Sequence, residues 1–249
     1  MEMIKNYYGS LCTEMYEILH KEAPQDELAF YLSYAEKGMK ILEPLCGSGR
    51  VLAPFIERGY DIKGIDLSAE MLAKLKEKVP NAKVFQKDIL KYDSTEKYDY
   101  IFISSGSVSL FTDMDLCKRI LHKMKDLLKK NGKFVFAVDT IADKCSDHTD
   151  YQKSISVKTE EGYELILKGK SYYDEKTHTQ YSPSIYELYD GTKLLQQERM
   201  DFQTHLYELG EIEPYLKEIG FTKVNVYSSY DKKIAENNQT EMFLYECSF

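Results

Sequence analysis

Short apolar runs alternate with stretches of helical periodicity in the first half of the chain. The run at residues 39–45 leads into a glycine-rich stretch at 46–49, after which residues 51–56 carry apolar side chains at helical spacing. Residues 61–66 predict a second strand, and Ser68 is a suitable N-cap for the helix that follows. This order of strand, helix, strand and helix is typical of a parallel sheet covered by helices.

Three more strands are predicted before residue 140, at 82–86, 98–104 and 134–138. The last of them is almost entirely apolar, as expected for a strand that is covered on both faces. A helix is predicted to begin at Thr112, and Asn131-Gly132 is expected to close it. These elements extend the sheet to five strands.

The pattern changes after Asp139. Residues 155–206 form short, alternating, tyrosine-rich segments separated by polar turns, which indicates antiparallel strands inserted after the fifth strand. A helix at 211–219 and strands at 221–227 and 242–247 follow the insertion.

Three parts are therefore expected along the chain. They are an N-terminal helical cap segment (1–38), a Rossmann-like domain (39–144 and 207–249) and an inserted antiparallel β subdomain (145–206). The fold class is α/β, with helices on both faces of the main sheet. The inserted sheet is expected either to cover a substrate site or to form a dimer interface, so a monomer and a homodimer both stay open.

Composition narrows the possible partners. The chain has 249 residues and a formal net charge of −8, which disfavours broad binding to nucleic acid, although a local basic groove is compatible with it. The five cysteines are scattered singly and no histidines cluster, so no metal site is expected. The N-terminal residues form no apolar signal region, and no stretch approaches the roughly 20 apolar residues that cross a bilayer. We expect a cytoplasmic protein with reduced thiols.

The glycine-rich stretch carries the clearest candidate chemistry. Glu43 ends a strand, and the glycines that follow let the backbone approach a ligand at a helix N-terminus. Leu52 occupies the third glycine position of the dinucleotide-binding pattern, so a nicotinamide cofactor is disfavoured. Asp66 lies 17 residues beyond Gly49, at a strand end from which a carboxylate can accept hydrogen bonds from both ribose hydroxyls of an adenosine. Asp88, after the third strand, is placed to accept from an adenine amino group.

Residues 41–50 (ILEPLCGSGR) and 59–72 (GYDIKGIDLSAEML) together resemble the class I S-adenosylmethionine-dependent methyltransferases, in particular their small-molecule N- and O-methyltransferases. The resemblance covers about the first 140 residues. It implies a seven-stranded sheet with S-adenosylmethionine across the carboxyl ends of the first strands, and S-adenosylhomocysteine as product. The residues that it implies for cofactor binding are Tyr8, Tyr16, Glu43, Leu45, Gly47, Gly49, Arg50, Asp66, Leu67, Met71, Asp88, Ile89, Ser104 and Ser105.

The chain departs from the family pattern at three places. Pro44 and Cys46 stand where small aliphatic residues are more usual, and neither change is expected to abolish binding. Residues 103–107 lack the Asn/Asp-Pro-Pro-Tyr/Phe motif with which resembling enzymes position an amino group of adenine, cytosine or glutamine. Methylation of such amino groups is therefore disfavoured.

Methyl transfer is an in-line displacement, for which a protein mainly aligns the acceptor and excludes water. A proton acceptor near the sulfur would assist an ammonium or alcohol substrate. His205 is the candidate, because residues 202–209 resemble the last inserted strand and turn of small-molecule methyltransferases. The expected substrate is a small metabolite, with an RNA or protein methyltransferase and a cofactor-binding regulatory protein as alternatives.

Overall fold

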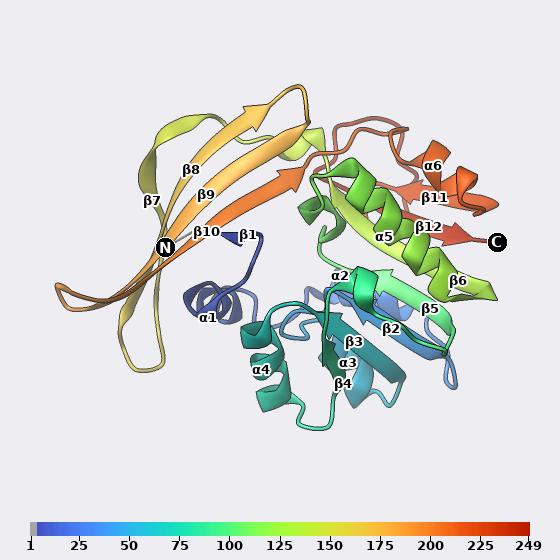
Figure 1. The fold of residues 1–249 in the computed structure, drawn as a ribbon, viewed down its shortest axis with the longest axis horizontal. Coiled ribbons are helices and arrows are strands. Elements are labelled where there is room, and N and C mark those ends of the chain that lie inside the picture. The colour runs from blue at the N-terminus through green and yellow to red at the C-terminus, as the bar shows by residue number, and fades with distance from the viewer. Residues whose placement is uncertain (1–3) are drawn as a thin grey trace.

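The computed structural model describes residues 4–249, which form two sheets with helices around the larger one (Figure 1). The larger sheet has the strand order β11-β12-β6-β5-β2-β3-β4, and β12 runs antiparallel to both of its neighbours. Its strands are β2 (Lys40–Pro44), β3 (Asp61–Asp66), β4 (Lys83–Gln86), β5 (Tyr98–Ile103), β6 (Leu128–Asp139), β11 (Lys223–Tyr227) and β12 (Met242–Ser248). The chain order reverses between β2 and β5, and ligands bind at such a switch point in open α/β sheets.

Alternate residues of the central strands face two separate cores. On β5, Tyr100 and Phe102 pack on one side, whereas Ile101 and Ile103 pack on the other, and all four are fully buried. The helices that enclose these cores are α2 (Gln25–Leu32), α3 (Leu52–Glu57) and α4 (Ala69–Lys78) on the first side, and α5 (Met114–Leu127) and α6 (Glu213–Glu218) on the second. The predicted α/β sheet with helices on both faces is confirmed.

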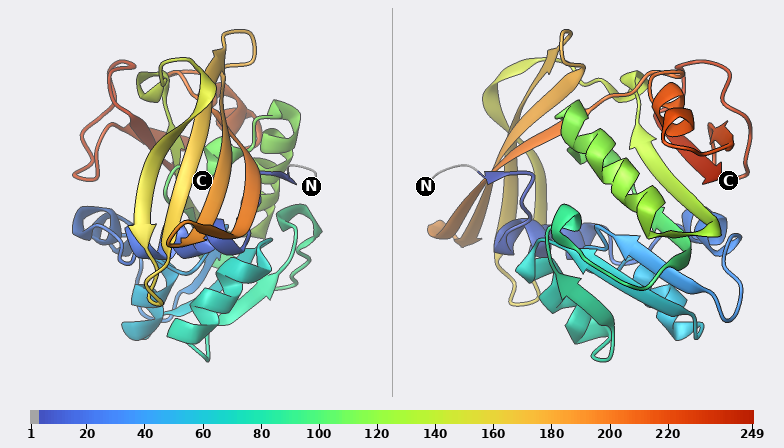
Figure 2. Two further views of the ribbon diagram at one scale, coloured as in Figure 1. Left: turned by 90° about the vertical axis from the view of Figure 1, so that its left-hand side faces the viewer. Right: turned by 45° about the vertical axis from the view of Figure 1, so that its right-hand side comes forward.

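The second sheet is inserted after the fifth strand of the main sheet, as predicted. Its order is β1-β10-β9-β8-β7, formed by β1 (Ile4–Lys5), β7 (His148–Lys158), β8 (Glu164–Asp174), β9 (Thr179–Asp190) and β10 (Lys193–His205). Leu11, Cys12 and Met15 of α1 (Ser10–Leu19) pack with Leu165 and Tyr186 of this sheet in a third core. The N-terminal segment thus lies between the two sheets, beside the main sheet's helix α4 (Figure 2).

Two sequence predictions about element boundaries were wrong. Asn131 and Gly132 do not close α5, which ends at Leu127, and both lie inside β6. Helix α5 is capped by Asp113 instead of Thr112, because the Asp113 carboxylate accepts from the backbone of Asp115 and Leu116. The two-residue strand β1 was also not predicted, since its parallel pairing with β10 is a contact between distant segments. Three short 3₁₀ helices complete the chain, at Ile89–Lys91, Val108–Leu110 and Ile141–Asp143.

None of the helices within residues 4–249 combines the length and the apolar character that crossing a bilayer requires.

Candidate cofactor and acceptor site

The loop after β2 is a tight turn that only small residues permit. Gly49 has φ +80°, and a Cβ at this position would lie 2.2 Å from Leu75 Cδ1 of α4. Leu45 also has a positive φ, 58°, a conformation that costs a non-glycine residue energy and that recurs at functional sites. The loop therefore holds its backbone close against α4 and leaves the carboxyl end of β2 open.

Asp66 joins this loop to the end of β3. Its Oδ2 accepts from the Gly47 backbone at 2.8 Å, and its Oδ1 accepts from the Ser68 backbone at 2.8 Å. Burial raises the Asp66 pKa, and the hydrogen bonds from the Ser68 and Gly47 backbones oppose that rise. Each carboxylate oxygen keeps a second lone pair, so Asp66 can still accept bonds from a ligand.

A polar cluster around Arg50, which we call the Arg50 cluster, lies next to the loop and links three separate segments. Ser104, at the end of β5, donates to Glu43 Oε1 at 2.9 Å. Arg50 pairs with Glu27 of α2 at 2.8 Å and also hydrogen-bonds Ser105. Burial raises the pKa of Glu43 well above its usual range, and the bond from Ser104 opposes that rise.

Two atoms of this cluster have no hydrogen-bond partner within residues 4–249, namely Glu43 Oε2 and Arg50 Nε. A buried polar atom without a partner is costly unless a ligand supplies one. The methionine part of S-adenosylmethionine offers an ammonium donor for a carboxylate and a carboxylate acceptor for a guanidinium. The donor set that the chain presents here therefore fits that cofactor.

Sequence reasoning missed Glu27. The residue is only 2% exposed, and it holds the Arg50 guanidinium from α2. A carboxylate on a helix has no spacing relation to the loop, so it is recognised only after the chain folds. The one available signal was a charged residue within the apolar pattern of residues 26–36.

The predicted adenine side lies at the ends of β3 and β4. Met71 and Ile89 are buried, whereas Leu67 is 54% exposed. Asp88 caps the 3₁₀ turn at Ile89–Lys91, where its Oδ1 accepts from the Leu90 backbone at 2.9 Å. Leu67, Asp88 and Ile89 thus lie near the carboxyl edge of the sheet. The exposed side chain of Leu67 is free to pack against an adenine ring.

Tyr8 and Tyr16 bring the N-terminal segment to this edge. The Tyr8 carbonyl accepts from the Ser68 hydroxyl at 2.7 Å. Burial raises the Tyr16 pKa, and Arg50 lies near enough to Tyr16 to oppose that rise. The two rings meet edge to face with centroids 6.2 Å apart. The N-terminal segment therefore reaches both Ser68, two residues after Asp66, and the Arg50 cluster.

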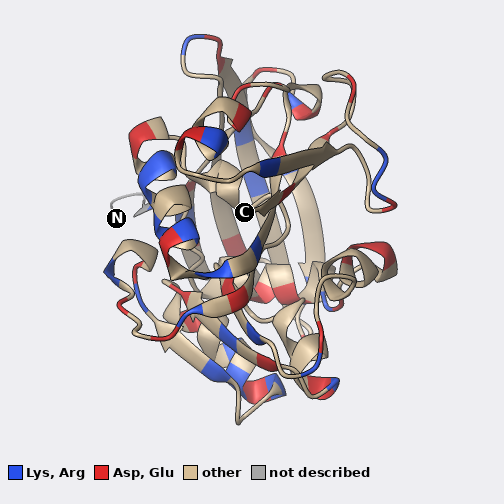
Figure 3. Ribbon diagram, turned by 90° about the vertical axis from the view of Figure 1, so that its right-hand side faces the viewer, with Lys and Arg blue, Asp and Glu red and all other residues tan. Residues whose placement is uncertain are grey.

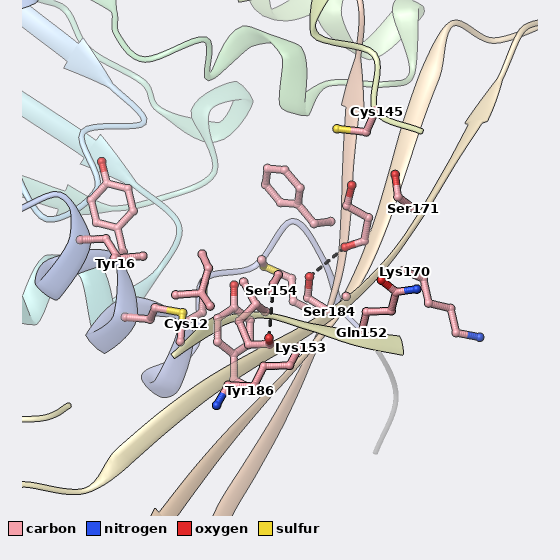
Figure 4. A pocket seen from close by; sticks show the side chains of 18 of the residues that line it. Cys12, Tyr16, Cys145, Gln152, Lys153, Ser154, Lys170, Ser171, Ser184 and Tyr186 are labelled. Atoms are coloured by element: carbon pink, nitrogen blue, oxygen red, sulfur yellow. Dashed lines mark hydrogen bonds between the residues drawn. The ribbon is translucent and has the colours of Figure 1, made fainter. Parts of the chain in front are cut away.

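A cavity of about 830 Å³ opens between α1 and the inserted sheet (Figure 4). Tyr8, Cys12 and Tyr16 line it from the N-terminal segment, and Ser184 and Tyr186 line it from β9. None of its lining residues is an Asp or Glu. Tyr8 and Tyr16 therefore lie between the cavity and the cofactor-side residues Ser68 and Arg50.

Asp139 is a second residue that sequence reasoning did not single out. It ends β6, where the chain leaves the main sheet for the insertion, and it lies so close to Gly106 that a Cβ there would be 2.2 Å from Asp139 Oδ1. No group within the described residues donates a hydrogen bond to its carboxylate. Burial, with a smaller effect of Asp143, raises the Asp139 pKa to about 7.

The structure does not bring His205 to this cavity. The His205 Nδ1 lies 3.1 Å from the Thr177 carbonyl, and its Nε2 lies 2.6 Å from Glu211 Oε1. Both ring nitrogens are thus engaged by protein groups, and neither faces the cavity. His205 is 3% exposed and lines a different, smaller hollow of about 590 Å³. These contacts favour a structural role over the predicted proton acceptor.

Within residues 4–249, no three His, Cys, Asp or Glu side chains gather closely enough to hold a metal ion.

Comparison with known proteins agrees with this geometry. Residues 41–132 match the model of a methyltransferase domain. A protein of Geobacillus sp. (strain WCH70) that is named as a methyltransferase is 23% identical over 92% of this chain and 95% of its own length. Among solved structures, an S-adenosylmethionine-dependent methyltransferase from Clostridium acetobutylicum superposes with a TM-score of 0.75 at 18% identity, covering 94% of this chain and 96% of that one. The sugar N-methyltransferase of Streptoalloteichus superposes with a TM-score of 0.73 at 17% identity, covering 100% and 98%.

The fold and the matched domain define a Rossmann-like methyltransferase. Residues 41–132 thus form a methyltransferase domain, and the whole chain has the fold of solved S-adenosylmethionine-dependent methyltransferases.

Proposed function

We propose that this enzyme methylates an amine or hydroxyl group of a small metabolite that binds between α1 and the inserted sheet. The observation that carries the proposal is the cavity of about 830 Å³, which has the size of a typical small-molecule pocket. Two of its lining residues, Tyr8 and Tyr16, also reach Ser68 and Arg50, so an acceptor inside the cavity would lie near the cofactor residues.

Each part of the cofactor would have its own residues. Glu43 and Arg50 would hold the methionine ammonium and carboxylate, and Asp66 would accept from the ribose hydroxyls. Bound S-adenosylmethionine supplies a methyl group that is already activated by its sulfonium. The protein's task is then to align the acceptor and to exclude water, for which α1 and the inserted sheet provide the walls.

A small acceptor is favoured over a macromolecule by two observations. The sugar N-methyltransferase of Streptoalloteichus shares this arrangement along its whole length. On the face shown in Figure 3, basic and acidic segments are interspersed, whereas binding to RNA needs a continuous basic stripe. The five cysteines are free, in keeping with a cytoplasmic location.

The test is titration calorimetry with S-adenosylmethionine, S-adenosylhomocysteine and NAD, followed by a screen of small amines and alcohols, with bulk RNA and protein as competing acceptors. Binding of the first two ligands and transfer to a small acceptor would support the proposal. Transfer only to RNA or protein would overturn it, and cofactor binding without any transfer would favour a regulatory protein.

A matched pair of variants tests whether the methyl acceptor binds in this cavity. Ser184, which lines the cavity from β9, is replaced in Ser184→Phe, so that a phenyl ring occupies the acceptor space. We expect a KM for the acceptor that rises at least tenfold, roughly 1.4 kcal/mol, with unchanged affinity for S-adenosylhomocysteine. The control is Leu195→Phe, in which the same ring is placed at a 40% exposed position of the same sheet. Equal kinetics for the two variants would remove the cavity from the acceptor site.

A further inference from the structure

The carboxylate of Asp139 has no assigned role in binding the cofactor, and its surroundings are unusual for a strand-end aspartate. Its backbone amide donates to Ser109 Oγ at 2.8 Å and its carbonyl accepts from the Tyr207 backbone at 2.9 Å, so its main chain is fixed on both sides. Its side chain, in contrast, receives no hydrogen bond from any described residue. A half-buried carboxylate that is rigidly placed and left without donors is available to a ligand.

The position of Asp139 relates it to both halves of the site. It ends β6, beside β5 in the sheet, and its Oδ1 packs against Gly106, one residue beyond Ser105 of the Arg50 cluster. Gly106 has φ +67° and no room for a side chain, so the carboxylate occupies the space that a Cβ would fill. After Asp139 the chain makes the short 3₁₀ turn at Ile141–Asp143 and then reaches Cys145 and Ser146, which line the cavity.

The titratable groups near Asp139 come from three separate segments, and none of those found within residues 4–249 is a cation. Burial raises the pKa of Tyr8 and of Tyr230, with further contributions from nearby charges that include Asp139, so both phenols lie within range of its carboxylate. Asp143, from the 3₁₀ turn that follows β6, adds a like charge. With no Lys or Arg to neutralise it, the carboxylate retains its affinity for a proton.

We propose that Asp139 is the proton acceptor for the methyl acceptor substrate, in the place that sequence reasoning gave to His205. The inference rests on the proposed function. An ammonium or hydroxyl group of the substrate gives its proton to the Asp139 carboxylate, which becomes a neutral carboxyl. The freed nitrogen or oxygen lone pair then forms the bond to the methyl carbon, while the carbon–sulfur bond breaks and its electron pair stays on sulfur.

The matched variants are Asp139→Asn and Asp143→Asn. The amide of Asp139→Asn keeps the shape of the carboxyl and disturbs no hydrogen bond, so the variant is expected to fold and to bind S-adenosylhomocysteine like the parent. The pH profile of kcat/KM for the parent should rise through about pH 7 as Asp139 ionises. In Asp139→Asn this rise should disappear, and the rate at pH 7 should fall by about 10²–10⁴-fold. Asp143→Asn should keep the rise with pH but move it to somewhat lower pH, because the like charge that helps to raise the Asp139 pKa is removed.

A second measurement does not depend on turnover. Carboxyl carbons of aspartate labelled with ¹³C are titrated by NMR in the parent and in Asp139→Asn, and the signal that is missing from the variant is assigned to Asp139. Titration near pH 7 supports the inference, and titration in the usual aspartate range, near about 4, overturns it. Full activity of Asp139→Asn with an unchanged pH profile also overturns it. Failure of the proposed function is distinguishable, because the parent would then methylate no small acceptor while the NMR titration of Asp139 stayed near pH 7.

Discussion

The carboxylate of Asp66 holds the glycine loop in place and can also bind a ligand. Two backbone amides, those of Gly47 and Ser68, already donate to its carboxylate, and this pairing fixes the glycine loop against the end of β3. The same carboxylate has lone pairs left for the ribose hydroxyls that we assign to it. Preorganisation of this kind lowers the cost of ordering the site when the cofactor binds.

Replacement of this carboxylate should therefore weaken cofactor binding. We expect Asp66→Ala to raise the Kd for S-adenosylhomocysteine by roughly 5- to 150-fold, or about 1–3 kcal/mol, because hydrogen bonds to a charged group are lost. Titration calorimetry measures the change. The control is Asp61→Ala, at the opposite end of β3, where an exposed carboxylate pairs with Lys83. Unchanged affinity in a folded Asp66→Ala protein would contradict the assignment to ribose.

Most elements of the main sheet could be predicted because each has a local signal. Ser68 caps α4 through the Met71 amide as its sequence context indicates, and the glycines mark the turn after β2. Contacts between distant segments have no local signal in the sequence. For this reason neither the pairing of β1 with β10 nor the contact of Glu27 with Arg50 was predicted. Asp139 looked like an ordinary strand end, since its missing donors and its contact with Gly106 exist only in the folded chain.

The inserted sheet is tied to the main sheet near α6 by the contact of His205 with Glu211. His205 ends β10, and Glu211 lies in the loop that leads to α6. Burial opposes ionisation of Glu211, but the hydrogen bond from His205 and the Glu208 backbone outweigh it and hold the Glu211 pKa below its usual range. Because His205 is also buried, we expect its contact with Glu211 to stabilise the fold.

A lowered pKa in the folded state fixes the sign of the pH effect. Glu211 stabilises the fold above the pKa of the unfolded chain, about 4.3, and this contribution is lost as the pH falls through the folded value. We expect Glu211→Gln to reduce the free energy of unfolding at pH 7 by about 1–3 kcal/mol. The difference from the parent should begin to shrink below about pH 4.3 and should vanish only below the lowered folded pKa of Glu211. Urea denaturation at several pH values measures it. Glu208→Gln, at an exposed neighbouring position, is the control, and an equal effect of both variants would argue against the link.

At the scale of the whole molecule, the cofactor site that we propose is assembled from parts that are far apart in sequence. The N-terminal segment contributes Tyr8, Tyr16 and Glu27, the main sheet contributes Glu43 and Asp66, and the insertion closes the adjoining cavity. The third core, in which α1 packs on the inserted sheet, joins the first of these parts to the last. Occupation of the cofactor site should therefore stabilise segments that do not themselves touch the cofactor.

This coupling can be measured by ligand-linked unfolding and hydrogen exchange. S-adenosylhomocysteine at about 100 times its Kd should raise the free energy of unfolding by about 2.7 kcal/mol, which corresponds to roughly 5–11 °C in Tm for a chain of this size. Amide exchange should slow in the loop after β2 and also in α1, because Tyr8 and Tyr16 connect that helix to Ser68 and Arg50. NAD, which is disfavoured because Leu52 replaces the third glycine of the dinucleotide-binding pattern, should change neither the Tm nor the amide exchange. If protection were confined to the β2 and β3 loops while α1 exchanged as before, the N-terminal segment would not be part of the cofactor site, and the acceptor cavity would have to bind independently of it.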